Sequence, residues 1–130
     1  MKRQPRRIDR GALLTLHEES LALFGGPRGI RDIGLLDSAL DRPRNQFLYE
    51  AESDLAALAA AYGFGLAKNH LFVDGNKRAA FLAIGLFLAI SGKRLRADPV
   101  DAIAIILALA AGEISEKQLA EWLRGNLGRR

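Results

Sequence analysis

The stretch from Ala79 to Ile90 most constrains what this chain can fold into, because it is apolar almost all round if it is coiled into a helix. A helix without a polar face is buried on every side, as in the middle of a helical bundle. The polar end that carries Lys77 and Arg78 must then emerge at one surface. We therefore expect an all-α domain of about six helices around a buried central helix from Asn76 to about Ser91.

Apolar periodicity and helix-capping residues predict five further helices. Their expected ranges are 9 to 24, 32 to 40, 53 to 69, 98 to 111 and 115 to 122. Pro43 is expected to break or restart the second helix, and the segment from Arg44 to Glu50 is read either as extended or as aromatic residues packed on the core. Gly63 and Gly65 each cost about 1 kcal/mol inside a helix relative to Ala, so they predict close approach of a neighbouring helix. No strand is predicted.

Length and composition indicate one domain, which we place at residues 8–127 after a basic N-terminal tail at residues 1–7. The chain has 130 residues, 49% of them hydrophobic, which is enough for one core and too little for two. It contains no cysteine, which excludes disulfides and thiolate metal sites and is compatible with a reducing cytoplasm. Its longest charge-free stretch, 79 to 92, is shorter than the roughly 20 residues that span a bilayer, so no membrane association is expected.

Net charge is +4 and the pI is near 9.9, values that raise the possibility of nucleic-acid binding. The excess lies mostly at the two ends: residues 2 to 10 hold five Lys or Arg, and Arg124, Arg129 and Arg130 close the chain. This distribution is more typical of two solvated tails than of a surface that reads DNA or RNA. Direct nucleic-acid binding is therefore not expected.

A base, an acid, an amide and two cations stand together directly before the apolar run, in the stretch His-Leu-Phe-Val-Asp-Gly-Asn-Lys-Arg at residues 70 to 78. Gly75 and Asn76 favour a sharp turn, and the helix that starts there has free N–H groups that can bind an anion. Lys77 and Arg78 in a first helical turn are misplaced by roughly 0.3–1 kcal/mol each unless an anion lies between them. The stretch therefore predicts a phosphate-binding turn.

The same stretch holds the groups that phosphate chemistry needs. Asp74 can hold a divalent cation, and Lys77 and Arg78 can bind phosphate oxygens. His70 can accept a proton near neutral pH. Phe72 is expected to point inward and so fix the loop with His70 and Asp74 facing one site. Each residue also has an ordinary structural role when it is taken singly, so the prediction depends on the whole set.

This stretch resembles the signature of the Fic/Doc family, His-x-Phe-x-Asp-Gly-Asn followed by two further residues, the second of which is Arg, here Arg78. Lys77 stands where the nucleotidyl-transferring Fic branch typically has Gly, and in this it resembles the Doc (death-on-curing) branch. The segments 29 to 40 and 111 to 115 also look like Doc-like proteins, so the likeness covers most of residues 8 to 124.

The resemblance implies an ATP-dependent toxin of a toxin–antitoxin module. Such a Doc-like kinase transfers the γ-phosphate of ATP to a threonine hydroxyl of the translation factor EF-Tu, and a Phd-like antitoxin restrains it with an amphipathic segment laid in a groove. The implied site residues are His70 as general base, Asp74 as Mg²⁺ ligand, and Gly75, Asn76, Lys77 and Arg78 as ATP-binding residues. The alternatives are a Fic-type AMP transferase and a non-enzymatic binding module with a relic motif.

The first helix adds two smaller expectations. Some Fic proteins inhibit themselves through a Ser or Thr, three residues, then Glu followed by Gly or Asn. Thr15 and Glu19 fit that pattern but Ser20 does not, so restraint by a partner is favoured over restraint within the chain. His17 has no metal-ligand spacing around it and is expected to be a surface or packing residue.

The resemblance also implies a role for the segment from 44 to 50, which precedes the helix expected at 53 to 69. In the family, the corresponding region forms a flap beside the active site that helps to align the target.

Overall fold

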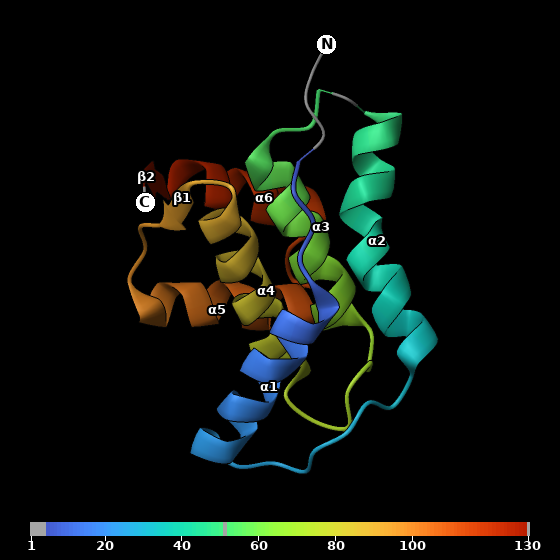
Figure 1. Cartoon of the computed structure of the whole chain (residues 1–130). Helices are drawn as coiled ribbons and strands as arrows, with labels where there is room; N and C mark the ends of the chain where they lie inside the picture. Colours follow the sequence, from blue (N-terminus) through green and yellow to red (C-terminus); the bar gives the residue numbers. More distant parts are fainter. Residues whose placement is uncertain (1–4, 51, 130) are drawn as a thin grey trace.

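The computed structural model describes residues 5–50 and 52–129. In these residues the chain forms six α-helices and one two-stranded sheet, in the order α1 (Arg10–Phe24), α2 (Ile33–Tyr49), α3 (Leu55–Lys68), α4 (Asn76–Ile90), β1 (Lys93–Leu95), α5 (Pro99–Ala110), α6 (Glu116–Gly125) and β2 (Leu127–Arg129). The all-α prediction is confirmed. Figure 1 shows α3 and α4 in the middle of the bundle, with the loop between them at the same end as α1.

Five helices start where the sequence places a capping side chain. Asp9, Asp32, Asp54 and Asp98 each accept a hydrogen bond from a backbone N–H of the first turn that follows. Ser115 forms a complete capping box with Gln118 before α6. These bonds satisfy N–H groups that the helix itself cannot pair, so the predicted helix starts are confirmed.

The centre of the bundle is a pair of helices, α3 and α4. The expected central helix α4 contacts α1, α3, α5 and β1, and α3 contacts α2, α4, α5 and α6. Small residues let these helices approach closely. A Cβ atom added to Gly63 would lie 2.7 Å from Ile84 Cδ1, and one added to Gly65 would lie 3.1 Å from the Cβ of Ala39. The prediction that both glycines mark close approach is confirmed.

Helix α2 is one continuous helix, so the predictions of a break at Pro43 and of an extended segment from Arg44 to Glu50 are wrong. Pro43 lies inside the helix and its side chain is buried. It belongs to an apolar stripe at helical spacing, formed by Leu36, Ala39, Leu40, Pro43 and Phe47. Burial of that stripe offsets the backbone hydrogen bond that proline cannot make. Phe47 packs on the core as the alternative held, but Tyr49 is 91% exposed.

The small sheet was not predicted. Strands β1 and β2 pair antiparallel, with Lys93 opposite Arg129 and Leu95 opposite Leu127. Each strand has three residues, which is too short to show the alternation that identifies a strand in a sequence. The pairing joins the chain after α4 to the chain after α6.

Three arginines of the two basic ends pair with acidic residues of the folded domain, and their side chains remain about half exposed. Arg7 pairs with Asp41 and Arg10 with Asp37, both on α2. At the other end, Arg124 binds both carboxylate oxygens of Asp54 at 2.6 and 3.0 Å. Residues 1–4 of the expected tail and Arg130 lie outside the described residues.

In the part of the chain that the structure describes, no helix has both the length and the apolar character needed to cross a membrane.

The α3–α4 approach makes a first prediction. Gly63→Ala would place a methyl group against Ile84, whose side chain is 2% exposed and cannot swing into solvent. We expect the free energy of unfolding to fall by about 1–2 kcal/mol, since overpacking outweighs the gain in helix propensity. Gly85→Ala on α4 is the matched control: nothing lies within 4 Å of its added Cβ, so it should stabilise by up to about 1 kcal/mol. Urea unfolding measures both, and equal effects would contradict the packing argument.

Candidate active site

The loop between α3 and α4 is held in shape by the side chain of Asn76. Its Oδ1 accepts a hydrogen bond from the backbone N–H of Phe72 at 2.9 Å, and its Nδ2 donates to the backbone carbonyl of Phe72 at 3.1 Å. One amide therefore satisfies both backbone groups of the residue that anchors the loop. Phe72 is 1% exposed, which confirms that it points inward.

The N-terminus of α4 differs from the starts of the other five helices that the structure describes. Its N-cap is Gly75, in the left-handed conformation with φ +77°, and no side chain caps it. The first helical hydrogen bond runs from the N–H of Ala79 to the carbonyl of Gly75 at 2.8 Å. The backbone N–H groups of residues 76 to 78, which come before this first bond, have no partner inside the helix and carry the positive end of its dipole. They suit an anion, as the sequence predicts.

His17 of α1 packs directly under this loop. Its ring stacks on Phe72 with 3.9 Å between ring centroids and 22° between the planes. Its Nε2 donates to the backbone carbonyl of Asp74 at 2.9 Å, since a carbonyl oxygen can only accept. The side chain is 2% exposed, so of the two predicted roles, surface residue or packing residue, His17 has the second. His17 thereby fixes the loop at the residue before Gly75.

A second brace comes from the chain between α1 and α2. The backbone N–H groups of Arg31 and Asp32 both donate to the carbonyl of Leu71, at 2.7 and 3.1 Å, and the N–H of Val73 donates to Gly29 at 3.1 Å. Ile30 and Phe72 form an isolated antiparallel bridge. The extended segment beside the motif is thus 29–32, and the segment 44–50, where the family flap was expected, is helical instead.

The proposed base and metal ligand lie on the solvent side of this loop. His70 directly follows Asn69, which ends α3, and its side chain is exposed. Asp74 is exposed as well, and its Oδ1 accepts a hydrogen bond from the N–H of Gly75 at 2.8 Å. Its other carboxylate oxygen faces Gly26, where an added Cβ would come within 2.5 Å. The backbone of residue 26 therefore forms one wall beside the carboxylate.

The two cations of the motif have different surroundings. Lys77 is exposed, whereas Arg78 is half-buried against the end of α1. The guanidinium of Arg78 lies 5.6 Å from the ring centroid of Phe24, and its Nη1 is 3.4 Å from the carbonyl of Ser20. Arg78 has five N–H donors, so this long contact orients the group and leaves others for phosphate oxygens.

The residues at this junction fit a nucleotide phosphate chain together with one Mg²⁺ ion. An uncapped helix start and two cations suit phosphate, and Asp74 offers one exposed carboxylate. Within residues 5–50 and 52–129, no three His, Cys, Asp or Glu side chains are grouped as metal ligands. Mg²⁺ is commonly held by one or two carboxylates, waters and the substrate's own phosphates, so a single Asp is a sufficient protein contribution.

The side chain of Asn76 has a different role from the one that the sequence predicts. The sequence assigns it to the nucleotide, but both ends of its side-chain amide are bound to Phe72. Only its backbone N–H, at the first position of α4, remains for an anion. Sequence reasoning also missed His17 and Gly26 as neighbours of Asp74. They lie 57 and 48 residues before it, and the only signal was that His17 falls at helical spacing between Leu13 and Leu21, on the buried face of α1.

Comparison with known proteins identifies a family and two relatives of this chain. The chain matches the model of the Fic/DOC family over residues 7–88. It is 32% identical over 119 residues to the protein kinase Doc of Escherichia phage P1, a match that covers 92% of this chain and 94% of that protein. It is also 46% identical over 92 residues to the toxin Doc of Mycolicibacterium smegmatis, covering 70% of this chain and 68% of that protein.

The chain therefore belongs to the Fic/Doc family, as its motif indicates. Both of these relatives are Doc proteins, in agreement with the resemblance to the Doc branch that Lys77 suggests.

The position of His17 predicts a pH dependence of stability. Burial lowers the pKa of His17 below its usual value, and the charge of Arg78 acts in the same direction, against the opposing hydrogen bond to Asp74. Below about pH 6.5 the unfolded chain therefore takes up a proton that the folded chain resists, so stability falls as pH decreases. His17→Gln, whose amide can still donate to the Asp74 carbonyl, should lose this component. Urea unfolding of both proteins between pH 7.5 and 5 measures it, and parallel curves would contradict the prediction.

Proposed function

We propose that this chain is the toxin of a toxin–antitoxin module and acts as a Doc-like protein kinase. The observation that carries the proposal is the uncapped, glycine-started α4, with Lys77 and Arg78 in its first turn and His70 and Asp74 exposed on the loop before it. The names of the two relatives, a protein kinase and a toxin, support the same function.

His70 is the proposed general base. It takes the proton of an acceptor hydroxyl as the hydroxyl oxygen attacks the γ-phosphorus of ATP, and the bond from that phosphorus to the β,γ-bridging oxygen breaks. The products are ADP and a phosphate ester on the acceptor, and the proton is on His70. An imidazole suits this step because its unprotonated ring nitrogen can accept the proton.

The remaining motif residues orient and stabilise the phosphate chain. The N–H groups at the start of α4 face the phosphate that binds there, with Lys77 and Arg78 adding positive charge as negative charge moves to the leaving oxygen. Asp74 is the residue that would hold Mg²⁺, which when bound neutralises charge on the phosphates. His17 and Asn76 act indirectly, because they hold the loop and contact no reacting atom.

The choice between phosphate transfer and AMP transfer rests on position 77. Lysine fills space that a glycine would leave for the rest of the nucleotide chain, and this favours an ATP bound with its terminal phosphate at the helix start. Fic-type AMP transfer is the second candidate, because the same base and turn could serve attack on the α-phosphate. In both reactions the acceptor is a protein hydroxyl. We infer a threonine of EF-Tu, whose modification would inhibit translation.

We propose that a separate antitoxin protein inhibits the activity of this toxin. Glu19, the residue that would act in an internal inhibitory motif, is exposed on α1. A Phd-like antitoxin with an amphipathic segment that lies in a groove of the bundle is the partner that we propose.

Isotope labelling tests the reaction. Purified protein with Mg²⁺, EF-Tu and ATP labelled at the α or the γ position should transfer only the γ label. His70→Ala should reduce transfer by about 100-fold or more, since it removes the base. Asp74→Asn keeps an oxygen for the Gly75 N–H but loses the charge, so it should also suppress transfer without unfolding the loop. Transfer of α label would assign the chain to the AMP-transferring branch, and Lys77→Gly would then be expected to change little.

Expression in growing cells tests the toxin and its partner together. The wild-type chain should stop growth, and His70→Ala at equal expression should not. Co-expression of the small gene beside this one should restore growth and yield a complex that co-purifies. Continued toxicity of the His70 variant would exclude base catalysis as the cause, and failure of both rescue and co-purification would exclude that gene as the antitoxin.

A further inference from the structure

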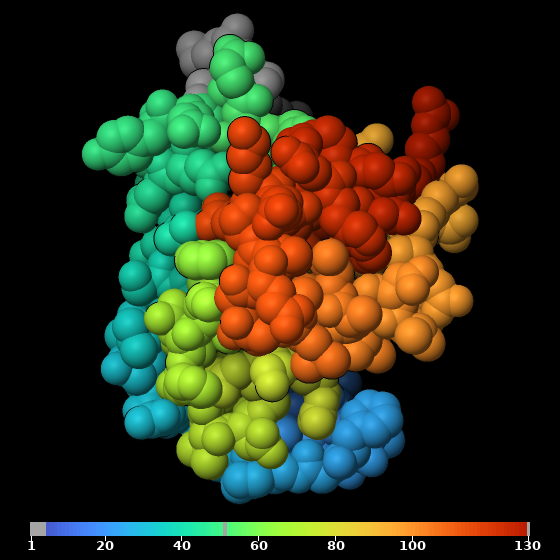
Figure 2. All heavy atoms as spheres, turned by 180° about the vertical axis from the view of Figure 1, so that it is seen from behind, coloured from blue at the N-terminus to red at the C-terminus, as the bar shows by residue number. Residues whose placement is uncertain are grey.

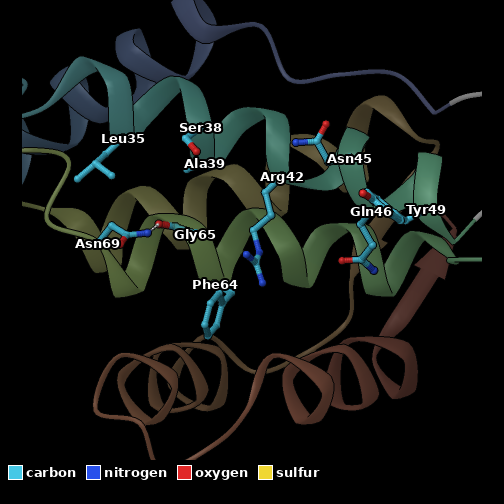
Figure 3. A pocket seen from close by; sticks show the side chains of 10 residues that line it. All are labelled: Leu35, Ser38, Ala39, Arg42, Asn45, Gln46, Tyr49, Phe64, Gly65 and Asn69. Atoms are coloured by element: carbon cyan, nitrogen blue, oxygen red, sulfur yellow. Dashed lines mark hydrogen bonds between the residues drawn. The ribbon is translucent and has the colours of Figure 1, made fainter.

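A groove between α2 and α3, outside the motif loop, has chemistry that the proposed function does not use. Its volume is about 380 Å³. Figure 3 shows its side chains projecting from the two helices, with Leu35 and Asn69 toward one end and Tyr49 toward the other. In Figure 2 the surface of α3 is visible between α2 on one side and α6 on the other. The polar residues of the lining are Ser38, Arg42, Asn45, Gln46 and Asn69, and its aromatic residues are Tyr49 and Phe64.

The lining is suited to a polypeptide in extended conformation. Asn45 and Gln46 each carry a carbonyl acceptor and an N–H₂ donor, which matches the alternating N–H and C=O groups of a peptide backbone. Ser38 adds a hydroxyl and Leu35 and Tyr49 add exposed apolar surface, at 41% and 91% exposure. Such a lining can pair the backbone of a bound segment and pack against its side chains.

One end of the groove adjoins the proposed base. Asn69 lines the groove and directly precedes His70. Leu35 lies in the first turn of α2, and its backbone N–H donates to the side chain of Asp32. The backbone N–H of Asp32 donates in turn to the carbonyl of Leu71 at 3.1 Å, next to His70. A segment in the groove can therefore present a hydroxyl to His70 without leaving the surface.

The charged group of the groove is Arg42. Its guanidinium carbon lies 4.7 Å from the ring centroid of Phe64, and it pairs with Glu116 at the start of α6. The Arg42 side chain is 45% exposed, so it is accessible from the groove. A planar guanidinium held over a ring is oriented to bind a carboxylate, and an acidic side chain of a bound segment would complement it.

We propose that this groove binds an extended segment of the protein acceptor, with an acidic residue of that segment at Arg42 and the modified hydroxyl at His70. This inference rests on the proposed function and adds the feature by which an acceptor is chosen. The Arg42 guanidinium lies over Phe64, which is six residues before His70 along α3 and its C-cap, or about 9 Å at 1.5 Å per residue. An extended chain covers that distance in about three residues. The acidic residue should therefore lie three or four residues from the hydroxyl.

Peptide binding tests the groove independently of catalysis. We use fluorescent 13-residue peptides that have a central threonine and a single Glu, and the Glu is placed in turn at each of the remaining positions. The peptides are titrated with the full chain in the absence of nucleotide, and their fluorescence anisotropy is measured. The peptide with Glu three or four residues from the threonine should bind best, by about fivefold, as expected for a partly exposed ion pair. Arg42→Glu should abolish that preference and favour a Lys at the same position. Glu116→Gln, which releases Arg42 from its internal partner, should strengthen it.

Arg44→Glu is the matched control, because it makes the same charge change on the same helix at a residue outside the groove lining. It should leave the preference unchanged. A preference that is absent, that depends equally on Arg44, or that survives Arg42→Glu would overturn the proposal, as would no measurable binding of any peptide. If Arg42→Glu instead weakens only the complex with the antitoxin, the groove belongs to that partner and the proposal is wrong.

Phosphate transfer to the same peptides separates the groove from the proposed function. Peptides that bind through Arg42 but receive no phosphate would support the groove and contradict the kinase. Transfer that ignores both the acidic residue and Arg42 would support the kinase and contradict the groove.

Discussion

Burial of Phe72 is the interaction on which the site depends. The α3–α4 loop carries polar residues that favour water, yet it must hold them in one arrangement above an apolar core. The phenyl ring provides the anchor, because it is enclosed by the bundle and stacked on His17. Its two backbone groups would be costly to bury unpaired, and the amide of Asn76 binds both. His70 and Asp74 lie exposed on either side of this inward residue.

The electrostatics of α4 then follow from the same loop. The other five described helices start with an Asp or Ser that accepts a hydrogen bond from a backbone N–H of their first turn. At α4 the cap is a glycine with no side chain, and two cations follow it. Among the described helices, the one start without a side-chain cap thus lies at the place where an outside anion could bind.

The sequence was sufficient for features that local residues determine. Caps at Asp9, Asp54 and Ser115, the glycines of α3 and the inward Phe72 all follow from patterns within one helix or turn. It failed where distant segments meet. The continuity of α2 depends on a stripe that packs on α3, and this outweighs the proline at position 43. His17 reaches the motif across 57 positions of sequence, and the two strands exist only because residues 127–129 pair with residues 93–95.

The small residues along α3 have a genetic consequence if the chain is a toxin. Gly65 lies against the backbone of Ala39 on α2, and Gly63 lies against the side chains of Ile84 and Leu119, so any larger side chain at either glycine must push a neighbour aside. Cells selected to survive expression of this gene would be expected to carry lesions there as well as in the motif. Such survivors would accumulate little folded protein, whereas survivors altered at His70 would retain it. The spectrum of escape mutations would thus report the two demands on this sequence separately, close packing and chemistry.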